Sequence, residues 1–327
     1  MLILPRAEWK ARRSPSDDTA QRIFPCVGRR ATAMRVSPIP LPLGANEPLC
    51  DFRGAIWPQT IGTAMFGDYT VWLWLLKLGA LLNLYFLVGT AAVNADAYVV
   101  VPAQIFLVVS LYRCLFPVRY EHYVVFHDSV LSSVFATRVL ATFAEVAYIF
   151  LFACVLQLLN VENVSWVNGL AWLMVLQVVI CQVCVWVAIL TERFEFYFYE
   201  ELGWVFMFVA NTIASAYLYL TVGTLAGREI LLELNLVFGV VYLPFQVINL
   251  VAVRAQAKKQ GHSEARWTLE RFATGLRRSI RVKNPRTDAE SWGGIVGLLW
   301  MTGYWATLLP MWVYYIIRVL SPDWAMS

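Results

Sequence analysis

Three polar residues share one face of an otherwise apolar stretch, SSVFATRVLATFAEVAYIF. Arg138, Thr142 and Glu145 stand four and three residues apart, which places them on the same side of an α-helix. A lone charge near the centre of a bilayer costs roughly 2.5–3.5 kcal/mol on insertion scales, so such groups normally face the protein interior. The spacing therefore predicts that Glu145 is an acid that responds to protons or cations by binding them. Arg138 is predicted to be an anion site or a counter-charge.

Arg138 and Glu145 are separated by seven residues, which corresponds to about 10 Å along a helix axis. At that separation we expect each of the two side chains to pair with a residue on another helix, and not with each other.

Other apolar stretches also carry polar side chains. Together they can form a path for a solute, an ion or a proton, or they can hold the helices together through hydrogen bonds worth about 0.6 kcal/mol each. The path candidates are Arg138, Thr142, Glu145, Asn211, Ser215, Glu233, Gln246 and Asn249.

Composition identifies the elements that must position these residues. Of the 327 residues, 59% are hydrophobic and 15% charged, and the mean hydropathy is +0.59. The long apolar runs do not alternate with period two, as barrel strands would, so helices must satisfy the backbone in lipid. The sequence predicts an all-α, polytopic membrane protein with a seven-helix bundle.

Seven stretches have approximately the 20 apolar residues needed to cross a bilayer. The chain divides into an irregular basic arm (1–69), six helices (70–253), a basic loop (254–292) and a seventh helix with a short tail (293–327). The expected spans are 71–93, 97–116, 129–158, 166–190, 202–222, 230–253 and 293–317.

Most Lys and Arg residues lie in the arm and in loop 254–292. Because basic loops favour the cytoplasmic side, we expect the N-terminus in the cytoplasm and the C-terminus outside. Asn163 begins an N-x-S sequon in a loop that this topology places outside, and is a glycosylation candidate. The multi-pass protein fits an endomembrane or the plasma membrane better than the mitochondrial inner membrane.

Loop 254–292 contains an amphipathic pattern. Leu269, Phe272, Leu276 and Ile280 fall on one helical face, as in helices that lie on anionic leaflets or engage a protein partner. Alternatively, the positive charges only enforce topology. The predicted lipid- or partner-binding residues are Arg266, Arg271, Arg277, Arg278 and Arg281.

The segment Thr191–Trp204 combines acidic and aromatic residues just before the fifth span. It is typical of an aromatic belt at the membrane interface. Alternatively, Glu200 and Glu201 attract cations at a helix N-terminus.

Several function classes are disfavoured. No nucleic-acid motif accompanies the basic segments. His122 and His127 lack the spacing of a metal site, and the last span has no lysine for retinal. No nucleophile–base arrangement is evident. We therefore predict no catalytic residue, metal or cofactor. The sequence is interpreted as that of a transporter or channel-like protein for a small solute or ion. The alternative is a non-catalytic scaffold or receptor-like protein. The sequence leaves the oligomeric state open.

Overall fold

The computed structural model describes residues 67–222, 227–260 and 268–321. The chain divides into two units, Met1–Arg53 and Gly54–Ser327. The first unit, with most of the predicted N-terminal arm, lies outside the described residues. All structural statements below concern the second unit.

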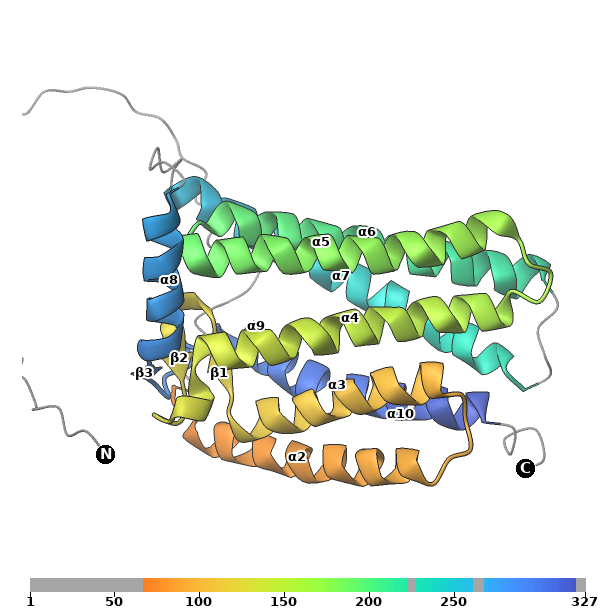
Figure 1. Ribbon diagram of the computed structural model, residues 1–327, viewed down its shortest axis with the longest axis horizontal. Coiled ribbons are helices and arrows are strands. Elements are labelled where there is room, and N and C mark those ends of the chain that lie inside the picture. Colours follow the sequence, from red (N-terminus) through yellow and green to blue (C-terminus); the bar gives the residue numbers. More distant parts are fainter. Residues whose placement is uncertain (1–66, 223–226, 261–267, 322–327) are drawn as a thin grey trace, which may run out of the picture. The chain divides into compact units, whose positions relative to one another are not determined.

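Seven spans form an all-α bundle, as the sequence predicted (Figure 1). Each is long and apolar enough to cross a membrane, so this is a multi-pass integral membrane protein. Six of the spans are single helices: α2 (Thr70–Ala91), α3 (Ala97–Leu115), α4 (Val134–Leu159), α5 (Ser165–Thr191), α6 (Phe194–Thr221) and α7 (Glu229–Gln260).

The seventh span is built from three pieces: α9 (Gly294–Trp300), the π-helical segment η4 (Met301–Ala306) and α10 (Leu308–Leu320). At the break, Asn83 of α2 donates a hydrogen bond of 2.9 Å to the Trp305 carbonyl. Irregular backbone at membrane depth requires such a partner, because lipid offers none. Gly79 permits the close approach, since a Cβ there would lie 2.5 Å from the Ala306 Cβ.

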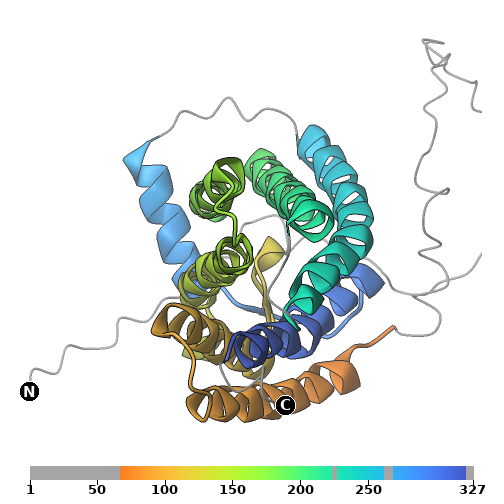
Figure 2. The same ribbon diagram turned by 90° about the vertical axis from the view of Figure 1, so that its right-hand side faces the viewer.

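Helices that follow each other in sequence pack side by side from α2 to α7, and the seventh span packs against α2 and α3 (Figures 1 and 2). In α4, 67% of the most apolar window is buried, against 17% in α7. From Tyr148 to Leu156, every residue of α4 except Phe150 is buried. Helix α4 is therefore the central element, and α7 is peripheral.

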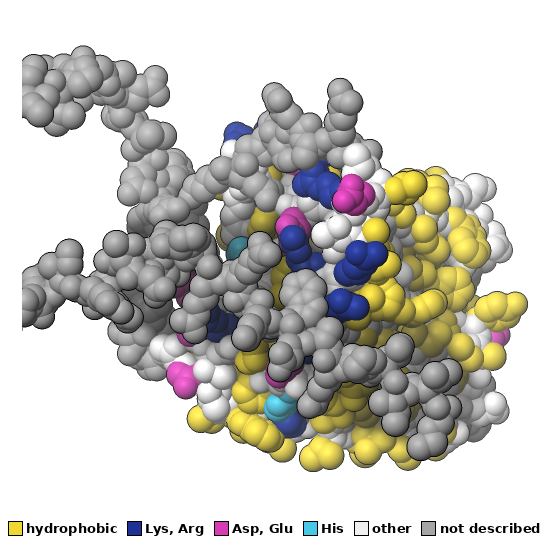
Figure 3. Space-filling model, turned by 60° about the vertical axis from the view of Figure 1, so that its left-hand side comes forward, with side chains coloured by type: hydrophobic (Ala, Val, Ile, Leu, Met, Phe, Trp, Pro, Cys, Tyr) yellow, Lys and Arg dark blue, Asp and Glu magenta, His cyan; other side chains and the backbone are white. Residues whose placement is uncertain are grey.

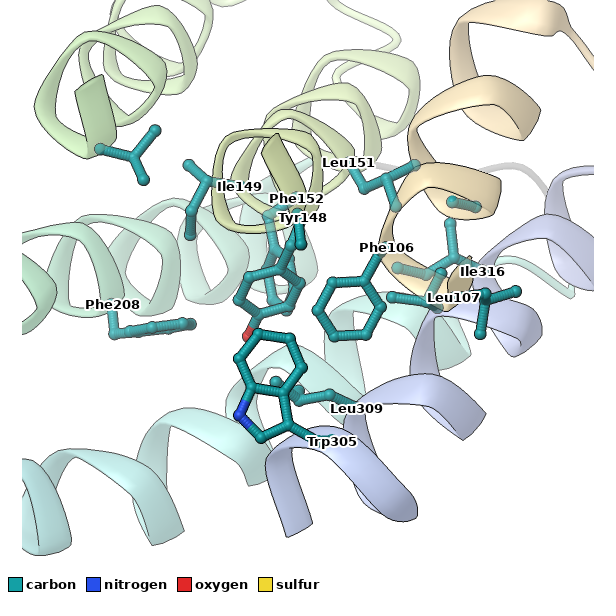
Figure 4. Close-up of a cluster of buried hydrophobic side chains, with 14 of the residues drawn as sticks. Phe106, Leu107, Tyr148, Ile149, Leu151, Phe152, Phe208, Trp305, Leu309 and Ile316 are labelled. Carbon is teal, nitrogen blue, oxygen red and sulfur yellow. The ribbon is translucent and has the colours of Figure 1, made fainter. Parts of the chain in front are cut away.

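An aromatic core fills the middle of the bundle around α4. Tyr148 packs against Phe106 of α3, with 5.5 Å between the ring centroids, and Phe106 stacks on Trp305 at 6.0 Å. Figure 4 shows these three rings together with Phe208 from α6. The core thus joins α3, α4, α6 and the broken seventh span.

Short elements lie at one end of the bundle, called here the α8 end. They are β1 (Val118–Arg119), η2 (Glu121–Tyr123), β2 (Val124–Val125), η3 (Val130–Ser132), α8 (Leu269–Arg281) and β3 (Asn284–Pro285). Strand β2 pairs antiparallel with β1 and parallel with β3. Helix α8 crosses the ends of the spanning helices and contacts α4 and α5 (Figure 1).

Two N-terminal caps set where α4 and α8 begin. The side chain of Ser133 accepts from the Ala136 backbone N–H, and that of Thr268 accepts from the Arg271 N–H. These bonds satisfy donors that have no partner within the helix. The cap on α4 fixes its first turn, one turn before Arg138.

Candidate functional site

Arg138 and Glu145 form a buried, two-pronged ion pair. The Nη1 of Arg138 lies 3.2 Å from Oε1 of Glu145, and Nη2 lies 2.9 Å from Oε2. The expectation that the two residues would not pair directly was wrong. Side chains on a helix lean toward its N-terminus, which brings the Glu145 carboxylate back toward Arg138.

Two neighbouring helices complete this ion pair. Gln182 of α5 donates from Nε2 to Glu145 Oε2 at 3.0 Å and accepts a hydrogen bond from Arg138. Glu200 of α6 places Oε1 3.9 Å from Nη1 of Arg138. The four side chains are all buried, and together they are called the charged cluster below.

A third carboxylate, Glu201, lies beside the charged cluster. It accepts hydrogen bonds from Gln246 and Asn249 of α7 and interacts electrostatically with Glu200 and Glu145. Sequence reasoning named both α7 residues but missed the acid that they bind. Helix α6 begins at Phe194, so Glu200 and Glu201 lie about two turns after its start.

The charged cluster is closed at the α8 end by a tyrosine and an apolar plug. The ring of Tyr120 lies 5.5 Å from the Arg138 guanidinium and 5.3 Å from that of Arg113. Around it, Tyr123 and Tyr197 pack on a second buried cluster of apolar residues: Val118, Val125, Val134, Val185 and Ile189. The loop between α3 and α4 thus covers the ion pair.

An open cavity of about 680 Å³ lies at the α8 end, outside this plug. Among the described residues its wall includes Glu121, which interacts electrostatically with Glu201 and Tyr197. The wall also contains His122 and four charged residues: Arg119, Arg286, Asp288 and Glu290. Polar groups therefore continue from an open, charged cavity toward the charged cluster.

A second polar cluster, the amide cluster, joins α6 to α7. Asn235 donates from Nδ2 to Ser215 Oγ at 3.1 Å and to Asn211 Oδ1 at 3.5 Å. All three side chains are fully buried, yet Asn211 Nδ2 and Asn235 Oδ1 have no hydrogen-bond partner. The structure thus brings together Asn211 and Ser215, two of the predicted path residues, and adds Asn235.

Three further candidates lie apart from both clusters. Thr142 donates to the Arg138 carbonyl and accepts from Trp186, so it braces α4 against α5. Glu233 accepts a hydrogen bond of 3.3 Å from Tyr219 at an exposed position. Asn163 is exposed in the loop between α4 and α5, with a φ of 53°, and its glycosylation stays a prediction.

The predicted basic residues of α8 have different surroundings. Arg271 donates to the Thr191 carbonyl at 2.8 Å, and Arg278 pairs with Glu192 at 2.5 Å. Arg277 and Arg281 are exposed. Arg266 lies outside the described residues.

Around Arg138, the carboxylates outnumber the cations. Glu145 and Glu200 are buried and Glu201 is half-buried, and within the described ranges Arg138 is the only cationic side chain that forms an ion pair with any of them. The other buried guanidinium, that of Arg113, lies instead over the rings of three aromatic residues: Tyr120, Trp300 and Trp305. Because unpaired charge is costly in a low-dielectric interior, such a site can neutralise its surplus by taking up a proton or a cation.

Gln182 and Glu200 are the residues that sequence reasoning failed to assign to the cluster. Both polar residues were visible in the sequence, but their proximity depends on how three helices pack. No group of three or more potential ligand side chains suited to a metal ion occurs in the described part of the chain. Comparisons with protein-family models, with curated proteins and with solved structures give no match for this chain.

Proposed function

We propose that this multi-pass membrane protein transports a small solute or ion and uses the charged cluster to bind a coupling proton. The single observation that carries the proposal is the surplus of carboxylates around Arg138. An interior built only to hold helices together gains nothing from an unpaired buried charge. A transporter that loads and releases a proton needs such a group.

The path proposed for this transport runs between the two ends of the bundle. It begins in the charged cavity at the α8 end, passes the Tyr120 plug to the charged cluster, and continues past the aromatic core to the amide cluster. In the structure described here the plug and the aromatic core close the path on both sides of Arg138. A closed state of this kind fits alternating access, in which one barrier opens at a time.

Glu200 is the proposed proton carrier, which revises the role first given to Glu145. Glu145 is held by two bonds from Arg138 and one from Gln182. Glu200 approaches the same guanidinium only to 3.9 Å, beyond hydrogen-bonding distance. The more weakly held carboxylate is the one that can exchange its proton without dismantling the cluster.

The test is to reconstitute the protein into liposomes and record currents on a solid-supported membrane after pH jumps and after additions of sugars, amino acids, amines and inorganic cations. We expect a current that depends on pH in the native protein and is lost in Glu200→Gln. Glu162→Gln is the matched control, because Glu162 is an exposed carboxylate in the loop between α4 and α5. Currents no larger than those of empty liposomes, or unchanged in Glu200→Gln, would refute the proposal.

A further inference from the structure

Helix α8 is attached to the bundle through a narrow strip of small and basic residues. A Cβ on Gly275 would lie 1.9 Å from the Leu190 carbonyl oxygen, so the α8 backbone rests directly on the end of α5. One turn away, Ser279 is fully buried. Arg271 donates to the carbonyl of Thr191, where the helix dipole of α5 favours a positive charge.

The apolar face of α8 is not the face that docks. The side chain of Leu269 is 90% exposed, that of Ile280 43% and that of Leu276 38%. These three residues fall along one side of the helix, about a quarter turn away from Gly275 and Ser279. In the described part of the chain, Leu269 is left almost uncovered, while Leu276 and Ile280 are covered over somewhat more than half of their surface.

Basic side chains border the apolar face. Arg277 and Arg281 are exposed, and neither forms an ion pair with another described residue. Arg278, in contrast, is tied to Glu192. The exposed surface of α8 is therefore an apolar strip flanked by two available positive charges.

The position of α8 indicates what covers the strip. The helix runs across the ends of α4 and α5 (Figure 1) and lies on their outer side (Figure 2). The neighbouring segment η3 also exposes apolar side chains, with Val130 83% exposed. Charged side chains of both signs gather at this end, while hydrophobic side chains cover the flank of the helices beyond it (Figure 3). This level of the bundle is where lipid headgroups meet acyl chains.

We infer that α8 lies in the plane of an anionic membrane leaflet. Leu269, Leu276 and Ile280 enter the boundary of the acyl chains, while Arg277 and Arg281 contact lipid phosphates and carboxylates. The apolar strip is continuous with the surface of the helices that lipid already surrounds, whereas a soluble partner would have to displace that lipid. The inference does not depend on the proposed transport, because none of these residues belongs to the charged cluster.

The experiment uses the full chain in nanodiscs, with a spin label on Ile280→Cys. The matched control is Thr274→Cys, an exposed position on the polar side of the same helix. Native cysteines also take up the spin label, and this background signal is measured on native protein treated with the same label. Collisions with oxygen report contact with lipid, and collisions with a water-soluble nickel complex report contact with water.

We expect the label at position 280 to favour oxygen and the label at 274 to favour nickel, in discs that contain phosphatidylserine. In discs of phosphatidylcholine alone, the label at 280 should shift toward nickel. Added salt should produce the same shift. Replacing both Arg277 and Arg281 with glutamine should weaken the preference for anionic lipid by roughly fivefold for each arginine.

Two outcomes would overturn the inference. In discs that contain phosphatidylserine, a label at 280 that meets nickel as readily as the label at 274 would show that the strip faces water or a soluble partner. Equal burial in both lipids, unaffected by the two arginine substitutions, would remove the anionic leaflet as the partner. Gel filtration of each variant identifies any that have lost the fold before the labels are compared.

Discussion

The charged cluster and the amide cluster both place polar atoms inside a membrane protein, but they differ in charge and in the number of helices that they join. The charged cluster joins α4, α5 and α6 through an arginine and carries more carboxylates than cations. The amide cluster joins only α6 and α7, carries no charge and leaves two polar atoms unpaired. A neutral cluster can lose a hydrogen bond at little cost, whereas a charged one cannot lose its cation. The two clusters should therefore differ in how much stability is lost when one polar member is removed.

The largest loss of stability should follow removal of the cationic side chain of Arg138. Arg138→Met leaves Glu145 and Glu200 buried without their counter-charge, so we expect a loss of about 3–5 kcal/mol in the free energy of unfolding. Denaturant unfolding in mixed micelles measures it. Adding Glu145→Gln to Arg138→Met should recover part of the loss, because one of the stranded charges is then removed. A loss below about 1 kcal/mol in the single variant would contradict the comparison, since the charged cluster would then behave like the neutral one.

A much smaller effect is expected in the amide cluster. Asn235→Leu removes the donor to Ser215 and Asn211, and hydrogen bonds between membrane helices average about 0.6 kcal/mol. Unfolding under the same conditions as for Arg138→Met gives the direct comparison. Thr212→Val on α6 is the control, because the hydrogen bond that the Thr212 hydroxyl donates goes to the Phe208 carbonyl of its own helix. A cost for Asn235→Leu equal to that of Arg138→Met would show that charge is not what separates the two clusters.

The smallest expected effect on stability concerns the ion pair between Arg278 and Glu192, which attaches α8 to the end of α5. Partial burial acts to raise the pKa of Glu192, but hydrogen bonds from Arg278 and Tyr123 outweigh it and leave that pKa below the ordinary value of 4.5. A lowered pKa means that the contribution to stability is present above about 4.5 and is lost as the pH falls through the lower, folded value. The pair is nearly half exposed, so the contribution should not exceed about 1 kcal/mol.

Hydrogen exchange of the α8 amides between pH 6 and pH 3 can detect this effect. We expect α8 to exchange faster at the acidic end of the range, after correction for the intrinsic rate. Glu192→Gln should remove the pH dependence. An identical pH response in the native protein and in this variant would assign the loosening of α8 to other groups.

The spans could be predicted from the sequence because length and hydropathy alone determine which segments cross a membrane. The main difference between the predicted spans and the helices of the structure is the start of α6, which lies roughly two turns before the predicted start. The segment from Phe194 to Glu201 mixes acids with aromatic residues, and hydropathy ranks such a segment as interfacial. Glu200 is buried opposite Arg138, and the half-buried Glu201 lies opposite Gln246.

The candidate site could be predicted only in part. Arg138 and Glu145 were identified because their charges are costly in lipid, and that cost depends on no other residue. Their partners depend on which faces of α4, α5 and α6 meet, and the spacing within one helix carries no information about that. The same limit explains Asn235, which was visible as a polar residue but could be assigned to Asn211 and Ser215 only once α6 and α7 were placed together.

The π-helical segment in the seventh span determines which residues α10 presents to the bundle. A π turn accommodates about one residue more than an α turn, and Thr307, which follows it, has a non-helical φ of −136° and ψ of −77°. The stripe that α10 buries, which includes Val313 and Ile317, therefore does not continue the helical phase of α9, which has no buried residue. Removing or adding a single residue between Met301 and Ala306 would leave the hydropathy of the span almost unchanged and still turn the wrong side of α10 toward α3.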